Sequence, residues 1–330
     1  RDPEEITFME PQAGGACRAG NIYNLLQRVL YRMVEQGQLE YAQIPVISLN
    51  LMGEEKHTGF RITPSLLSGG IAAGCYGDLI MCLYQQVKPY EQNPGETDRI
   101  RSQVEKKLCE SIRRHRNGRH TREKNYRYAC EVFSKVPVKP GKKKRVGITG
   151  EIYMKYSKLG NDDIESFLLR QGMEPYSGGF VNYCLYLVDT ERYKAEKYQH
   201  NPIMAKACAF VLHRLCEAQK HLLTVIGETD RFQTDLPFPE LKEKVQGILA
   251  EGCNTGDGWL IAAEVIQYVE KGCGSVLILH PFGCLVSHVC ERGILQRLHA
   301  RFPDVSIQTI EYDYDQSKTL RESRILLAIS

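Results

Sequence analysis

The sequence predicts an α/β fold in which helices wrap parallel sheets. Short apolar runs of strand length alternate along the chain with longer segments whose apolar residues recur every three or four positions. Glycine-containing loops separate many of these segments. The repeated order of strand, loop, helix and strand favours parallel sheets with right-handed crossovers, and such folds place their sites beyond the carboxyl ends of the strands.

Residues 1–140 are expected to form a first α/β domain, truncated at its N-terminus and carrying a helical extension. Glycines lower the helix propensity of one long apolar segment, at residues 64–87. Two prolines and a lysine run then mark a linker, so the boundary is placed at residue 140. The elements expected here are strands at 5–10 and 43–49, a helix at 22–37, the helix at 64–87, and polar helices to about residue 133.

Residues 141–330 are expected to form a second α/β domain with a helical insertion at about 179–250. A strand followed by a glycine turn opens it, and a helix with aspartate at its start follows, as the helix dipole prefers. The elements expected here are strands at 144–150, 275–280 and 305–313, and helices at 162–172, 179–226, 240–252, 259–269, 286–298 and 317–329.

Composition narrows the function classes. The net charge of +3 is too small to indicate nucleic acid by itself, and we expect no apolar run to approach the roughly 20 residues of a membrane span. No secretory signal pattern precedes the first strand, so we expect a cytoplasmic protein with reduced thiols. Positive charge gathers at 113–124 and 139–145, either as solvated loops or as a patch for an anionic partner. We expect the first of these runs to be exposed.

Three of the twelve cysteines differ from the rest, because Cys17, Cys253 and Cys284 each have glycine nearby in a loop before a predicted helix. Free N–H groups and the helix dipole would lower the pKa of a thiol there, and thiolate is the form that binds iron or zinc. An iron–sulfur cluster, a redox or nucleophilic thiol, and plain structural cysteines all stay open on spacing alone.

Two further residues are catalytic candidates. Glu151 follows a predicted strand in GITGEIY and is either an acid/base or a helix cap, and His288 lies one turn beyond Cys284 and is either a site residue or an ordinary histidine. The chain has no phosphate-loop GK[ST], no GxGxxG at a strand-to-helix turn and no GxSxG elbow. These absences argue against P-loop ATPases, dinucleotide enzymes of the usual type and common serine hydrolases.

Five motifs occur in the order QAGGACRAGN, VGITGEIYMKYSKLGN, EGCNTGDGWLIAAEVI, HPFGCLVSHV and IEYDYDQS. Together they resemble the C-terminal, dehydratase-like region of activase-related proteins of the 2-hydroxyacyl-CoA dehydratase system. That region is itself similar to the dehydratase subunits and to double-cubane cluster proteins. The resemblance runs from about Ile6 to Leu327.

The resemblance implies two Rossmann-like domains around an iron–sulfur cluster, either 4Fe-4S or double-cubane. It maps Cys17 and Cys284 onto cluster ligands and Cys253 onto a third cysteine of the family, with a further ligand expected upstream of Cys17. The chain departs from the family pattern at several loop positions, which puts the substrate specificity in question. These positions are Ala16, Gly20, Val286, Ser287, Tyr314 and Asp315.

The function implied by the resemblance is an iron–sulfur module of anaerobic metabolism. It would support low-potential electron transfer to a 2-hydroxyacyl-CoA, or its radical dehydration as a lyase. Expected partners are an ATP-dependent activase, an acyl-CoA substrate and a second copy in a homodimer, with no nucleic acid, no membrane and no ATP on this chain alone. The alternatives are a non-catalytic interaction or electron-relay domain that docks the activase, and a metal-free nucleotide-binding regulator.

Overall fold

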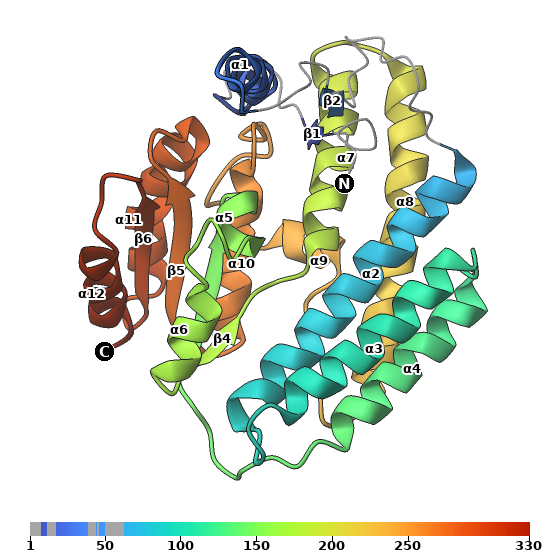
Figure 1. The fold of residues 1–330 in the computed structure, drawn as a ribbon, viewed down its shortest axis with the longest axis vertical. Coiled ribbons are helices and arrows are strands. Elements are labelled where there is room, and N and C mark those ends of the chain that lie inside the picture. Colours follow the sequence, from blue (N-terminus) through green and yellow to red (C-terminus); the bar gives the residue numbers. More distant parts are fainter. Residues whose placement is uncertain (1–7, 12–17, 39–43, 45, 50–62) are drawn as a thin grey trace. The chain divides into compact units, whose positions relative to one another are not determined.

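The computed structural model describes residues 8–11, 18–38, 44, 46–49 and 63–330. The chain divides into two compact units, Arg1–Ile62 and Thr63–Ser330, and each is considered by itself (Figure 1). The domain boundary expected at residue 140 lies within the second unit, and it stays a prediction.

The first unit contains two parallel strands joined through a helix. Strand β1 (Phe8–Pro11) pairs with β2 (Val46–Leu49), with Phe8 opposite Val46 and Pro11 opposite Leu49. The turn η2 (Arg18–Asn21) leads into α1 (Ile22–Glu35) between them. The strand–helix–strand order agrees with the predicted pattern, whereas Cys17 lies outside the described residues.

The second unit is built on a four-stranded sheet in which every neighbouring pair is parallel, so the predicted α/β class is confirmed. Its order is β4 (Glu174–Tyr176), β3 (Arg145–Gly150), β5 (Cys273–Pro281) and β6 (Ser306–Tyr312). Strand β5 is central, because it pairs with β3 on one side and β6 on the other. A central parallel strand is buried on both faces, which accounts for its nearly continuous apolar sequence.

Successive residues of β5 pack into two different cores. Val276 and Ile278 face the cluster that includes α10 (Gly258–Glu270) and α11 (Arg292–Arg301). Leu277 and Leu279 face the other cluster, to which three helices contribute. These helices are α5 (Ile152–Tyr156), α6 (Ile164–Arg170) and α12 (Lys318–Ile329).

A layer of helices shares the α10 core (Figure 1). Its members are α2 (Pro64–Val87), η3 (Lys88–Tyr90), α3 (Glu96–Arg113), α4 (Arg119–Ser134), α7 (Phe180–Lys197), α8 (Pro202–Gly227) and α9 (Phe238–Glu243). Helices α7, α8 and α9 occupy the stretch between β4 and α10 that was expected to be a helical insertion.

The expectation that no segment reaches membrane-spanning length needs correction. Residues Ser65–Tyr90 form a helical segment with a mean hydropathy of 1.5, long and apolar enough to cross a bilayer by length and composition. Core helices of soluble proteins meet the same criteria, and one such segment is weak evidence for a membrane. Tyr76, Leu79 and Leu83 of this helix are buried in the helical core.

Candidate functional site

Cys284 lies where the sequence places it, between the end of a strand and the start of a helix. Strand β5 ends at Pro281, and Gly283 turns the chain with a φ of 72°, a left-handed value that favours glycine. The Cys284 N–H donates to the Pro281 carbonyl at 3.2 Å, and the Cys284 carbonyl accepts from the His288 N–H at 3.1 Å. The thiol is therefore held at the carboxyl end of the central strand.

The segment after Cys284 is a π-helix, η4 (Ser287–Glu291), rather than the start of a regular α-helix. It carries His288 and a further cysteine, Cys290, and passes directly into α11. Single π-helical turns are rare and are frequent at functional sites. The predicted helix at 286–298 is thus α-helical at Val286, π-helical over Ser287–Glu291 and α-helical again from Arg292.

Cys253 lies in a tight loop that leads into α10. The Cys253 carbonyl accepts the Trp259 N–H at 2.9 Å, and a Cβ at Gly258 would approach that carbonyl oxygen to 2.2 Å. Only glycine at position 258 therefore permits this turn. A Cβ at Gly256 would lie 2.7 Å from the Val286 side chain, so the Cys253 loop packs against the Cys284 loop.

The two predicted cysteines are joined by a third that sequence reasoning missed. The pKa of Cys290 is raised by burial and then by Coulombic interaction with Cys253, Glu291 and Cys284, so both predicted cysteines are within its electrostatic reach. All three cysteines are partly buried. In the sequence interpretation, Cys290 is only one residue of the predicted helix at 286–298. Its position six residues after Cys284 is the signal that could have found it.

The expected lowering of the Cys284 pKa is wrong. Burial raises this pKa, the hydrogen bonds from Ser287 lower it, and the carboxylates Glu291 and Glu151 raise it further. Desolvation and nearby negative charge therefore outweigh the N–H groups at the start of the turn. The free thiol is favoured until a cation or cluster offsets the charge of the thiolate.

Acidic side chains surround these thiols. Glu291 is fully buried; its Oε1 accepts the Ser287 hydroxyl at 2.7 Å, and its Oε2 has no hydrogen-bond partner among the described residues. Burial raises the pKa of Glu291 to about 8. Burial also raises the pKa of Asp257 well above its usual range, with added repulsion from Glu151 and Glu291.

Glu151 has the capping role that was one of its two interpretations. Its carboxylate accepts the Met154 N–H at 3.0 Å as the N-cap of α5, and its own N–H donates to the Leu279 carbonyl at 2.8 Å. Burial raises the pKa of Glu151, while two backbone N–H groups lower it. Its charge acts on Cys284 and Asp257, so the cap is also part of the acidic surroundings.

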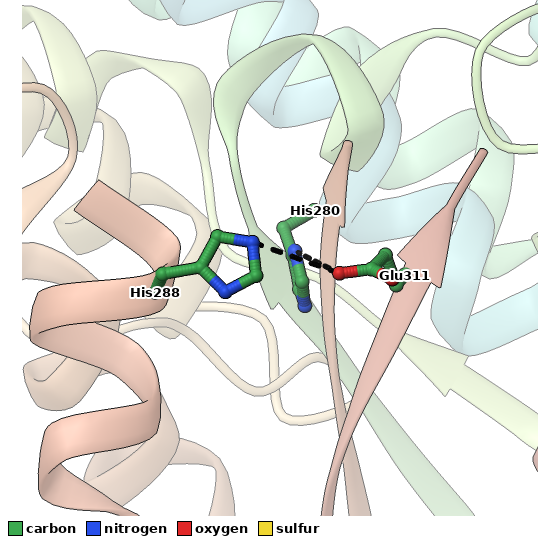
Figure 2. A group of neighbouring side chains, drawn as sticks. All are labelled: His280, His288 and Glu311. Atoms are coloured by element: carbon green, nitrogen blue, oxygen red, sulfur yellow. Dashed lines mark ion pairs between the residues drawn. The ribbon is translucent and has the colours of Figure 1, made fainter. Parts of the chain in front are cut away.

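His288 belongs to a group of three side chains that Figure 2 draws. Its Nε2 lies 3.6 Å from Oε2 of Glu311 on β6, and His280 on β5 approaches the same oxygen. The sequence interpretation did not include His280 or Glu311. The basic run at 113–124 is elsewhere, in the helical layer. Arg113, Arg116 and Lys124 are exposed as expected, whereas Arg122 is half-buried and Asn117 is buried.

Comparison with protein-family models, with curated proteins and with solved structures finds no match for this chain. A functional assignment therefore depends on the site residues and on the motif resemblance.

Proposed function

We propose that this chain is an iron–sulfur module of the 2-hydroxyacyl-CoA dehydratase type, with two Rossmann-like domains that together hold the cluster. The observation that carries the proposal is the contact between the Cys253 and Cys284 loops at the carboxyl edge of the sheet. These cysteines come from separate motifs, 31 positions apart in the sequence. Cys290 becomes a candidate ligand beside them. The motif resemblance also proposes Cys17, which lies outside the described residues.

The donor set suits a cluster better than a single zinc ion. A tetrahedral zinc held by thiolates needs sulfur atoms about 3.8 Å apart. Within the described ranges, the group of three candidate ligands whose donor atoms all lie within 4.8 Å contains no cysteine. The three thiols therefore do not form a compact mononuclear site as they stand, and the proposal of a cluster follows the motif resemblance.

The protonation of the acidic side chains would influence the reduction potential. Glu151, Asp257 and Glu291 are all within electrostatic reach of one another beside the thiols. Burial raises the pKa of all three, so they lower the potential only where they are ionised, because negative charge near a cluster opposes the addition of an electron. The bound cluster would supply the one-electron chemistry, while these side chains would set its electrostatic environment.

The test is reconstitution of the full chain with iron and sulfide under strict anaerobiosis. Iron and sulfide per chain and the visible absorption of the cluster are measured for C253S, C284S and C290S. The matched controls are C208S and C216S, because both cysteines lie in α8, away from the loops. Loss of iron at Cys253 and Cys284, with retention in both controls, is the expected result. Equal iron in all five variants would contradict the proposal.

Activity separates the dehydratase from the docking alternative. The reconstituted protein is mixed with an ATP-dependent activase and a 2-hydroxyacyl-CoA, and formation of the enoyl-CoA is followed. Dehydration supports the lyase. A cluster that accepts an electron from the activase but gives no dehydration would replace it with the electron-relay domain.

A further inference from the structure

Strand register places a histidine directly beside a glutamate at the edge of the sheet. His280 on β5 and Glu311 on β6 are partners across the parallel pair. His280 Nδ1 lies 4.0 Å from Glu311 Oε2, and His288 Nε2 reaches the same oxygen at 3.6 Å from the π-helix (Figure 2). The three donor atoms all lie within 4.8 Å of one another.

The protein itself makes little use of the His280 imidazole. This side chain is 0% exposed, and its Nε2 has no hydrogen-bond partner in the part of the chain that the structure describes. Nδ1 has one long contact, 3.4 Å from the Pro281 carbonyl oxygen. Nε2 is not the nitrogen that faces Glu311, so the case for a ligand rests on Nδ1, whose hydrogen bond to the protein is long.

The position of the group also points to a ligand. It lies at the carboxyl ends of two adjacent parallel strands, on the side of the sheet where α/β folds bind ligands. Its third member is on the π-helical turn, a local geometry that is rare outside functional sites. The thiol site and this group thus follow the same strand end, but their donor residues are different.

We propose that His280, His288 and Glu311 form a second metal site, for a divalent cation of the zinc class. Two imidazoles and one carboxylate are a donor set that zinc and neighbouring transition ions accept, and three protein ligands leave a position open for water or a substrate. This site does not depend on the proposed iron–sulfur function, because none of its ligands is a cysteine.

The donor atoms of the three side chains are slightly farther apart than a bound zinc ion requires. A tetrahedral zinc ion needs about 3.4 Å between nitrogen and oxygen donors, so the three side chains must move together on binding. His288 is 33% exposed and Glu311 21%, which leaves both room to adjust. Arg292 forms an ion pair with the Glu311 carboxylate, with Nη2 3.0 Å from Oε2. Arg292 is therefore a competitor that the cation has to displace.

The test is zinc affinity, measured by competition with a chromophoric chelator. The full chain is used in the C253S/C284S/C290S background, so that the thiols of the sheet edge do not bind the ion. One zinc per chain is expected. H288Q and E311Q should each weaken binding at least about 100-fold. R292Q should tighten it several-fold, since it removes the competing cation. H299Q is the matched control, because His299 lies nearby but bonds the Ile307 carbonyl at 2.9 Å.

Cobalt keeps the test decisive if the triple-serine chain fails to fold. When thiolates coordinate Co²⁺ in the unsubstituted protein, the spectrum contains intense near-ultraviolet bands. When only imidazole and carboxylate groups coordinate it, the spectrum contains only weaker visible bands. Visible bands that disappear in E311Q and H288Q, but persist in H299Q, support the site. Zinc affinity in E311Q and H288Q equal to that of H299Q, with folding verified by circular dichroism, would overturn it. The iron and sulfide assay is separate, so the failure of one proposal is distinguishable from that of the other.

Discussion

Lys155 Nζ lies 2.7 Å from Oε1 and 2.9 Å from Oε2 of Glu264, and each side chain is only 3% exposed. The Thr149 hydroxyl donates to the same carboxylate at 2.5 Å. The pair connects α5 with α10 beside the end of β3, so it ties together helices from the two cores. A buried charge is tolerated only with a partner, which makes this pair a sensitive point of the fold.

Removing one member of the pair should be far costlier than removing both. We expect K155M to lower the free energy of unfolding by about 3–5 kcal/mol, because it leaves the Glu264 carboxylate buried and unpaired. The double variant K155M/E264M should recover most of that loss. Urea denaturation measures both. The control is K135M, since Lys135 and Glu131 form an exposed pair at 2.5 Å, worth at most about 1 kcal/mol. A K155M variant no less stable than K135M would contradict this account.

Gly150 should not tolerate a side chain. Its φ is +129°, and a Cβ there would lie 2.0 Å from the Leu279 carbonyl oxygen of the neighbouring strand. We expect G150A to destabilise the protein by more than about 2 kcal/mol, from strain and a displaced backbone. G77A is the matched control, because that helical position has open space around its Cβ and should gain roughly 0.5–1 kcal/mol. Thermal unfolding of the two variants gives the comparison, and equal melting temperatures would rule out the predicted clash.

Asp78 should make stability fall between about pH 4 and pH 7. Its carboxylate accepts the N–H groups of Phe180 at 2.7 Å and Val181 at 3.0 Å, at the start of α7. Burial nevertheless raises its pKa from 3.8 to about 7. The folded state then binds the proton more tightly than the unfolded state, so stability is greatest below pH 4 and declines until the group is ionised in both states.

The measurement compares the unsubstituted protein with D78N at pH 5 and pH 8. The free energy of unfolding of the unsubstituted protein should fall by about 2 kcal/mol relative to D78N over this range. D98N is the control. The Asp98 pKa is lowered: burial raises it, but hydrogen bonds from Lys88 and Tyr84 outweigh that effect, so Asp98 stays ionised throughout the range. A difference that does not change with pH for D78N would show that Asp78 is ionised in the fold at pH 5.

The central strand β5 could be predicted from the sequence, because a strand that is buried on both faces has a nearly continuous run of apolar residues. The helix at 64–87 was predicted with correct bounds despite its glycines, since packing in the helical core outweighs their propensity. Strand β4 was missed, because three residues including Pro175 carry no strand pattern of their own. Its pairing with β3 comes from the tertiary structure.

The candidate site could be predicted only in part, because tertiary structure rather than a local sequence pattern brings some of its residues together. Glycine neighbours identified Cys253 and Cys284, since the tight turns that position them need glycine locally. The sequence pattern alone predicts that Cys290 is an ordinary residue of an apolar helix. Its place beside the other cysteines depends on the π-helical turn, and that turn depends on packing. The pairing of His280 with Glu311 depends on the register of two strands that are separated by a whole helix. No local pattern encodes such a register.

The short strand β4 also limits how this sheet can grow. It is the outermost strand on its side, and Pro175 at its centre has no N–H to donate. A strand from another polypeptide would find too few backbone groups there to form a ladder, so this edge resists both strand addition and edge-to-edge aggregation. A second copy of the chain, in any homodimer, would have to associate elsewhere than by continuing the sheet past β4, either at the β6 edge or through side-chain surfaces.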